Sequence, residues 1–292
     1  NSDVSFKMKA GKKAYLLTGI NHFNYGAPRD NNGDNFTDVT LQNRISLFQK
    51  WSFDRNKNRE LSLAGRYLYE NRWGGEMDWN PEFRGGDSVY AESIYTHRWE
   101  LIGKYQLPTS ERIMFSFSYN YHDQNSVYGK VPFAAQQQIA FSQLHWNKKV
   151  GRHDFLVGTA IRYTYYDDNT YATADSINNQ PSITWLPGVF LQNEIGLNER
   201  TTFLLGARYD HNSIHGNIWT QRVALKWAPN QKNIFRLNTG TGYRVVNLFT
   251  EEHAALTGAR RVVVKEKLRP EQSINANLNY IRKFYAKNGA VV

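Results

Sequence analysis

Apolar and polar residues alternate along most of this chain. From Arg112 to Asp123 the sequence reads RIMFSFSYNYHD, with isoleucine or aromatic residues at alternate positions and mostly small or polar residues between them. A β-strand turns successive side chains to opposite faces of a sheet, so this alternation predicts a strand with one apolar and one polar face. The same period recurs in the segments ELSLAGRYLYE, DFLVGTAIRYTYY, TTFLLGARYDH, NIWTQRVALKW, NIFRLNTGTGY and SINANLNY.

The predicted strands are long. We expect roughly thirteen of them, many with about 10 to 14 residues, by the period-two criterion. Strands of globular sheets usually have about 5 or 6 residues. A longer strand suits a segment that crosses a lipid bilayer at a tilt. The strand pattern therefore favours an all-β, antiparallel transmembrane barrel.

The connections between these strands alternate in length. Short polar turns are expected at 11–12, 54–59, 108–111, 149–152, 198–200, 229–232 and 286–289. Longer segments are expected at 26–38, 74–88, 124–135, 168–181 and 245–269, whereas the connection at 211–216 is short. Short turns at one end and long loops at the other are typical of outer-membrane barrels, where the short turns are periplasmic.

Tryptophans lie near both ends of the predicted strands. Three fall near the short turns (Trp51, Trp146 and Trp227) and three near the long loops (Trp73, Trp185 and Trp219). Two aromatic girdles at the membrane interfaces would have this distribution. A soluble β-sandwich or large propeller could carry the same aromatics in its core, but its strands should be shorter and its connections less polarised.

Composition agrees with strands that have one face in lipid. Aromatic residues make up 14% of the 292 residues, yet the mean hydropathy is -0.64. No run of about 18 apolar residues is present, so the sequence offers no transmembrane helix. The absence of cysteine excludes a disulfide framework and thiolate chemistry. The first residues lack the features of a signal peptide.

The basic residues indicate what the polar face could meet. The formal net charge is +10, and seven arginines fall on the polar parity of their strands: Arg44, Arg66, Arg98, Arg162, Arg208, Arg222 and Arg236. In a barrel these side chains would line the lumen. They could be neutralised by an acidic plug domain, by an anionic solute, or by acidic neighbours such as Glu70, Glu100 and Asp210. Because basic residues are spread along the whole chain, we expect no nucleic-acid partner.

The ends of the chain suggest a partial barrel. The sequence stops at Ala290-Val291-Val292, directly after the turn AKNG, where another strand would begin. Bacterial barrels have even strand numbers as a rule. We therefore expect strands to be missing at the C-terminus and at the N-terminus, and we expect residues 1–292 to form part of one barrel domain without a plug.

The most distinctive segment runs from Thr239 to Tyr280. It contains the triplet Gly242-Tyr243-Arg244 at the end of a predicted strand, a loop, and the element Leu268-Arg269-Pro270-Glu271-Gln272-Ser273 at the start of the next strand. This arrangement resembles a signature region of TonB-dependent outer-membrane receptors. Pro270 stands where the loop becomes a strand, a position where a missing N–H costs little.

The resemblance implies a function in the outer membrane of a Gram-negative bacterium. Receptors of this family have a 22-stranded barrel in outer-membrane lipid, closed by an N-terminal plug, and they import scarce nutrients with energy passed through the plug by the TonB complex. The resemblance thus implies a ferric siderophore or other metal chelate as ligand, with cobalamin, haem and oligosaccharide as alternatives. The haem receptors typically carry Arg-Ala-Pro and Asn-Pro-x-Leu elements, whereas this chain has Arg244-Val245-Val246 and Glu266-Lys267-Leu268.

The predicted loop after Arg244 holds the densest mixture of charge and imidazole. The candidates for ligand binding are Arg244, Asn247, Glu251, Glu252, His253, Arg260 and Arg261. His253 could be an axial ligand of haem, and the arginines could pair with carboxylate or catecholate oxygens. Alternatively, EEHAALTGAR forms a short solvated helix with acids at its start and Gly258 at its end.

Two other classes of function remain as alternatives. No spacing in the chain matches a nucleophile triad, a zinc site or a phosphate loop, so we expect no catalytic residue, bound metal or cofactor. An outer-membrane phospholipase or protease would need a Ser/His or Asp/His pair at one rim. A passive porin could use the same arginines to select anions; the segment upstream of the barrel would distinguish a porin from an importer.

Overall fold

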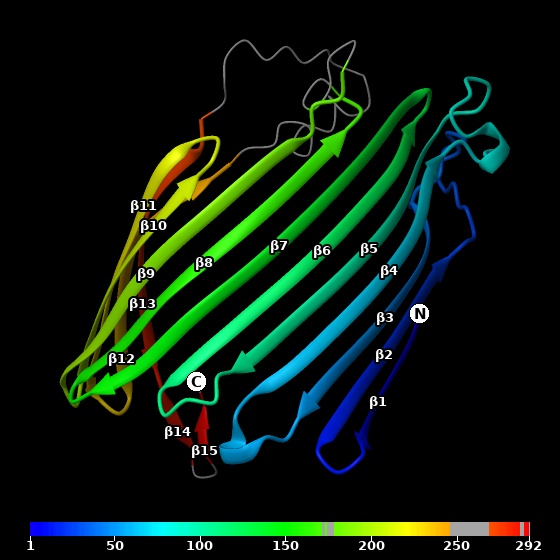
Figure 1. Cartoon of the computed structure of the whole chain (residues 1–292). Coiled ribbons are helices and arrows are strands. Elements are labelled where there is room, and N and C mark those ends of the chain that lie inside the picture. Colours follow the sequence, from blue (N-terminus) through cyan, green and yellow to red (C-terminus); the bar gives the residue numbers. More distant parts are fainter. Residues whose placement is uncertain (171–172, 174–177, 246–268, 287–288, 292) are drawn as a thin grey trace.

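Thirteen strands form one antiparallel sheet in which every strand pairs with its neighbours in sequence (Figure 1). The computed structural model describes residues 1–170, 173, 178–245, 269–286 and 289–291. The strands are β1 (Ser2–Ala10), β2 (Ala14–Tyr25), β3 (Leu41–Phe53), β4 (Leu61–Gly75), β5 (Ala91–Gln106), β6 (Arg112–Tyr128), β7 (Val131–Val150), β8 (His153–Asp168), β9 (Ser182–Asn198), β10 (Thr201–Asn212), β11 (Gly216–Asn230), β12 (Asn233–Arg244) and β13 (Glu271–Arg282). A separate hairpin of β14 (Phe284–Ala286) and β15 (Gly289–Val291) follows.

The predicted all-β architecture is confirmed, and the strands reach beyond the expected lengths. The thirteen strands of the sheet range from 9 residues in β1 to 20 in β7. Two single turns of 3-10 helix, Asn56–Asn58 and Pro81–Phe83, lie in connections. No helix in the described part of the chain has the length and apolar character needed to cross a membrane.

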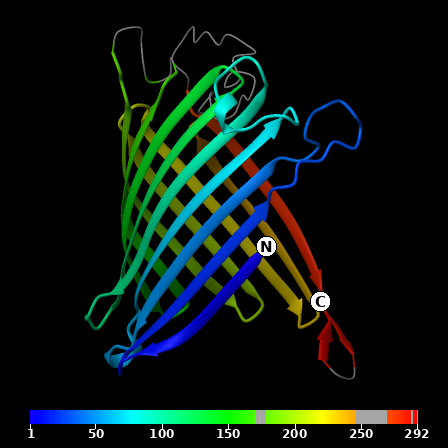
Figure 2. The same ribbon diagram turned by 90° about the vertical axis from the view of Figure 1, so that its right-hand side faces the viewer.

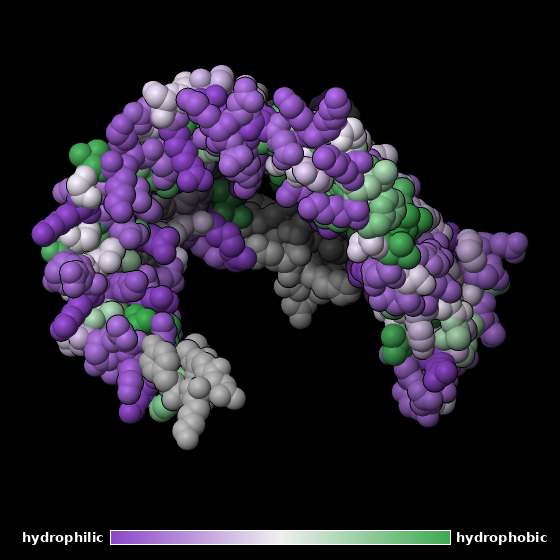
Figure 3. All heavy atoms as spheres, turned by 90° about the horizontal axis from the view of Figure 1, so that it is seen from below, coloured by the Kyte–Doolittle hydropathy of each residue, from purple (hydrophilic) through white to green (hydrophobic). Residues whose placement is uncertain are grey.

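The sheet is strongly curled and open. Viewed from below, down the axis about which the sheet curls, it forms a hollow shell with a gap on one side (Figure 3). Its edges are β1 and β13, which lie on the same side of the molecule (Figure 2). Within the described ranges these two strands do not pair with each other. Part of a barrel wall has this shape.

Strand register separates the two faces of the sheet. One row of directly opposed residues crosses five strands through Leu144, Thr159, Val189, Tyr209 and Trp219. Side chains of this apolar face stay exposed because no second layer of the described chain covers them. Leu191 is 52% exposed and Leu205 46%. An isolated sheet with such a face would not be stable in water, since apolar side chains require an apolar environment.

Aromatic side chains gather at both ends of the apolar face. Trp227 stacks on Phe235 near the short turns, with ring centroids 5.4 Å apart. Near the longer connections, Tyr163 packs against Trp185 and Tyr209 against Trp219, with ring centroids 4.8 Å apart in each pair. Rings that combine an apolar body with a polar tip favour the interface between lipid and water. The two aromatic belts predicted from the tryptophans are therefore present.

One predicted loop is instead a hairpin. The segment 124–135 forms the ends of β6 and β7, joined only by Gly129 and Lys130. Ser126, Val127 and Phe133 are buried there, so the segment gains enough packing to remain a strand despite its mixed sequence. Gly129 has φ of 58°, a left-handed conformation that glycine adopts without a Cβ penalty. Together with 213–215, this makes a second short connection at the long-loop end.

The turn at Gly129 provides a test of the fold with a matched control. Gly129 and Gly151 have φ of +58° and +59°, but an added Cβ would lie 2.8 Å from the Tyr90 ring only at Gly129, with nothing within 4 Å at Gly151. Both alanine variants should lose about 1–2 kcal/mol from the left-handed backbone. Gly129→Ala should lose about 1 kcal/mol more, because Tyr90 must move. Urea unfolding of the refolded protein measures both, and equal losses would contradict the packing of this hairpin.

Candidate functional site

The seven arginines predicted to share a face do so. Register places Arg44 opposite Glu70, Arg66 opposite Glu100, and Arg98 opposite His122. Strand pairing across the other half of the sheet places the remaining four arginines on the same face: Arg162, Arg208, Arg222 and Arg236. All seven therefore lie on the polar face, opposite the exposed apolar side chains. That this face lines a lumen stays a prediction.

Two of these arginines converge on one carboxylate. Arg66 Nη2 lies 2.8 Å, and Arg98 Nε 2.7 Å, from the same oxygen of Glu100. The side-chain amide of Asn120 satisfies both its oxygen and its nitrogen when its oxygen faces Arg98. In that orientation the oxygen accepts a hydrogen bond from Arg98 Nε at 3.0 Å. The carboxylate side chain is only 15% exposed. This cluster of Arg66, Arg98 and Glu100 keeps a net positive charge.

A second carboxylate is held by Arg208. The guanidinium donates from Nε and Nη2 to the two oxygens of Asp210, each at 2.7 Å. Asp210 is 1% exposed, and a bidentate partner offsets the cost of burying its charge. Its place depends on Gly188 of the neighbouring strand, because a Cβ there would come 2.1 Å from Asp210 Oδ1. Gly188 and Asp210 are direct cross-strand partners.

The end of β12 adds to this second cluster. Pairing between β11 and β12 ends at Gly240. Beyond that point, the phenol of Tyr243 interacts electrostatically with Asp210, Arg208 and Arg162.

A third basic group lies on β11 and β12. Lys226 stands directly opposite Arg236, and Arg222 lies four residues from Lys226 on the same face. Like charges in direct cross-strand positions destabilise a sheet. None of these three cations has a carboxylate within ion-pair distance among the described side chains. Their neighbours across β12 and β13 are uncharged amides: Asn238, Asn275, Asn277 and Asn279.

The two halves of the signature region meet across β12 and β13. Gly242 faces Ser273, Tyr243 faces Gln272 and Arg244 faces Glu271. Arg244 Nη2 forms an ion pair of 3.0 Å with Glu271, so this candidate ligand-binding residue joins the strands on either side of the connecting loop. The remaining loop candidates lie outside the described residues: Asn247, Glu251, Glu252, His253, Arg260 and Arg261.

Polar contacts at the long-loop end include a residue that sequence periodicity did not single out. Arg84 donates to Ser93 Oγ at 3.1 Å and to Asn125 Oδ1 at 2.8 Å, and its guanidinium lies over the Tyr95 ring. It thereby attaches the 76–90 connection to β5 and β6. Arg84 lies in a connection where apolar and polar residues do not alternate regularly. Its charge between apolar segments is the one sequence feature that could have indicated its contacts with β5 and β6.

Asp87 and Lys130, which lie in two connections at the long-loop end, form an ion pair. A hydrogen bond from Lys130 and its positive charge lower the pKa of Asp87 below its ordinary value. The two side chains are 2.8 Å apart and well exposed, so salt screens the attraction between them.

Among the described residues, no group of three or more histidine or acidic side chains is arranged to hold a metal ion.

Comparison with protein families gives a match over nearly the whole chain. The family model described as "TonB dependent receptor-like, beta-barrel" matches residues 10–290. Over 132 residues, 44% of this chain and 20% of the relative, the sequence is 24% identical to the iron-regulated outer membrane virulence protein of Vibrio cholerae.

Solved structures share the fold at low sequence identity. The ferric enterobactin receptor of Pseudomonas aeruginosa matches 99% of this chain with a TM-score of 0.67 and 11% identity. The siderophore receptor PiuA of Acinetobacter baumannii matches 98% with a TM-score of 0.64 and 12% identity, and the copper transporter OprC matches 98% with a TM-score of 0.66 and 11% identity. The chain spans about half of each, 48%, 53% and 49% respectively.

The family match explains both faces of the sheet. A curled antiparallel sheet with an uncovered apolar face and aromatic belts is the wall of a membrane barrel. Members of this family are receptors and transporters rather than enzymes. The chain belongs to the TonB-dependent receptor family, as part of the β-barrel in the outer membrane of a Gram-negative bacterium.

Proposed function

We propose that the complete protein imports an anionic metal chelate, foremost a ferric siderophore, across the outer membrane. The observation that carries this proposal is the excess of arginine and lysine over carboxylates on the polar face. Arg66 and Arg98 share Glu100, and Arg222, Lys226 and Arg236 have no carboxylate at ion-pair distance in the described chain. Guanidinium groups suit the oxygen atoms of carboxylate and catecholate ligands.

The proposal assigns the polar face to the inside of the barrel and the apolar face to outer-membrane lipid. An apolar face 25 Å or so in height must contact hydrocarbon, whereas charged side chains on that face are destabilising. A plug domain inside the curl would bring energy from the TonB complex. The plug would also meet the polar face and could neutralise part of its charge.

The relatives support a metal chelate over other cargoes. Of the three similar structures, one is named for ferric enterobactin, one for siderophores and one for copper, and the similar curated protein is iron-regulated. Cobalamin and haem are the alternative ligands. The loop candidates from Asn247 to Arg261 are proposed to contact the chelate from outside, together with Arg244.

Uptake by the full-length receptor tests this function. We expect a strain that lacks its own siderophore receptors to gain saturable iron-55 uptake from a panel of catecholate and hydroxamate chelates, and to lose it when the TonB complex is deleted. Haem and cobalamin are the comparison ligands. No binding of any ferric chelate at micromolar concentration would contradict the substrate class, and uptake without TonB would instead indicate a passive channel.

The basic group on β11 and β12 gives a more local prediction. The double variant Arg222→Gln and Arg236→Gln removes two cations from the proposed lumen, whereas Ala224→Gln, between them on the same face, adds the same amide without removing charge. Each charge-assisted hydrogen bond is worth about 1.5–3 kcal/mol. Uptake at subsaturating chelate should therefore fall about tenfold or more in the double variant and stay near wild type in the control. Equal uptake in all three proteins would contradict an anionic route along this face.

A further inference from the structure

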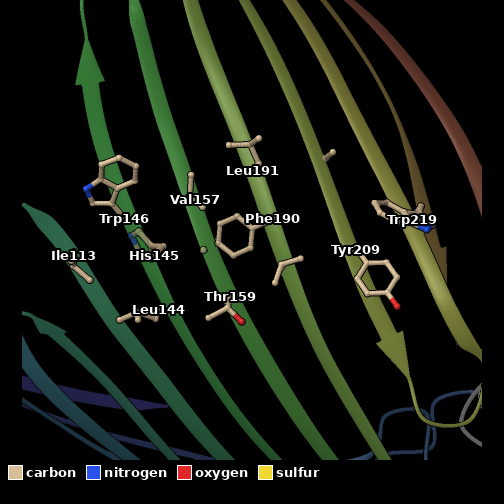
Figure 4. A pocket seen from close by; sticks show the side chains of 13 residues that line it. Ile113, Leu144, His145, Trp146, Val157, Thr159, Phe190, Leu191, Tyr209 and Trp219 are labelled. Carbon is tan, nitrogen blue, oxygen red and sulfur yellow. The ribbon is translucent and has the colours of Figure 1, made fainter.

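A groove of about 780 Å³ crosses the apolar face from β6 to β11 (Figure 4). Its floor is made of smaller side chains, Val157, Thr159 and Ala207, and its ends carry the rings of Trp146 and Trp219. The Thr159 hydroxyl donates to the Gly188 carbonyl oxygen at 3.1 Å. This polar atom of the floor is thus satisfied within the sheet, and the groove offers an apolar ligand nearly continuous hydrocarbon contact.

The groove runs obliquely between the two aromatic belts. Trp146 lies four residues before the end of β7, at the short-turn end, and Trp219 lies three residues after the start of β11, at the opposite end. Neighbouring strands are about 4.8 Å apart, so crossing from β6 to β11 takes about 24 Å. The strands of an outer-membrane barrel tilt by about 35–45° within an apolar band about 25 Å tall, so this crossing descends about 15 Å of the band. An acyl chain in one leaflet of the bilayer suits both this depth and the chemistry of the groove.

A cation and an anion adjoin the lower end of the groove. Trp146 Nε1 donates to Glu111 Oε2 at 3.1 Å, and Lys148 pairs with the other oxygen of Glu111. Hydrogen bonds from Lys148 and Trp146 lower the pKa of Glu111, so it is ionised at neutral pH. Both charged side chains are partly exposed, 38% for Lys148 and 37% for Glu111. Such a pair complements a headgroup that itself carries one cation and one anion.

We propose that this groove binds an acyl chain of a zwitterionic phospholipid whose amine and phosphate lie at Glu111 and Lys148. The occupant is lipid because the apolar face adjoins the bilayer and the groove begins beside the short-turn interface, where Glu111 and Lys148 lie. The phosphate would pair with Lys148 and the ammonium with Glu111. The proposal depends on the membrane location of the barrel and not on the identity of the imported ligand.

Native mass spectrometry of the full-length receptor tests the groove. The protein is purified in mild detergent, stripped of lipid and mixed with phosphatidylethanolamine bearing one palmitoyl and one oleoyl chain. Ala207→Trp fills the floor, and Leu237→Trp adds the same ring elsewhere on the apolar face. We expect the fraction of lipid-bound protein to fall at least tenfold in Ala207→Trp and to stay at the wild-type level in Leu237→Trp. Val189→Phe narrows the same groove and replaces Ala207→Trp if that variant does not fold.

The headgroup contacts are tested with the same assay. Wild type should prefer phosphatidylethanolamine to phosphatidylglycerol of the same chains, and Lys148→Gln and Glu111→Gln should each reduce that preference at least threefold. Lys149→Gln, on the opposite face, should leave it unchanged. Equal lipid binding by groove-filled protein and control would overturn the proposal. So would a preference for phosphatidylglycerol in the wild type, or groove-dependent dimers in place of bound lipid.

Discussion

Backbone hydrogen bonding is the constraint on which this structure depends. In the hydrocarbon of a bilayer no water can satisfy a free N–H or C=O group, so strands must bond to neighbouring strands along their whole membrane-spanning length. The ladder from β1 to β13 meets this demand with nearly continuous register. Because each strand also has a strict period of two, the same ladder sorts side chains into an apolar and a polar face. The aromatic belts, the arginine clusters and the groove all follow from that sorting.

The polar face shows how buried charge shapes such a wall. Asp210 lies almost fully buried against Arg208, and its carboxylate occupies the space that a side chain at position 188 would fill. Glu100 joins two arginines on neighbouring strands. These contacts neutralise part of the positive charge of the polar face. Neutralisation by acidic neighbours was one of the alternatives predicted for the arginines of this face. The cations on β11 and β12 have no carboxylate at ion-pair distance within the described ranges, and the proposed function assigns an external anion to this region.

Much of the architecture could be predicted because local pattern and global fold agree in a membrane strand. The number of strands, the two faces, the belts and the shared face of the seven arginines all follow from periodicity. The sequence did not reveal the β6–β7 hairpin, because Gln124 to Ala135 has mixed composition and becomes a strand through packing of Ser126 and Phe133. The relation of Gly188 to Asp210 and the groove around Ala207 depend on register between distant segments. Period alone does not specify that register.

The division between the two faces is tested most directly by a charge placed on each side of one strand. Leu47 and Ser46 are consecutive residues near the middle of β3, and register puts Leu47 beside Ile20 on the apolar face and Ser46 beside Asn21 on the polar face. Folding free energies in lipid vesicles can be compared for Leu47→Arg and Ser46→Arg. An arginine facing lipid near the midplane should cost about 2–4 kcal/mol, whereas the one on the polar face should cost well under half of that. An equal or larger loss in Ser46→Arg would contradict the assignment of the apolar face to the membrane.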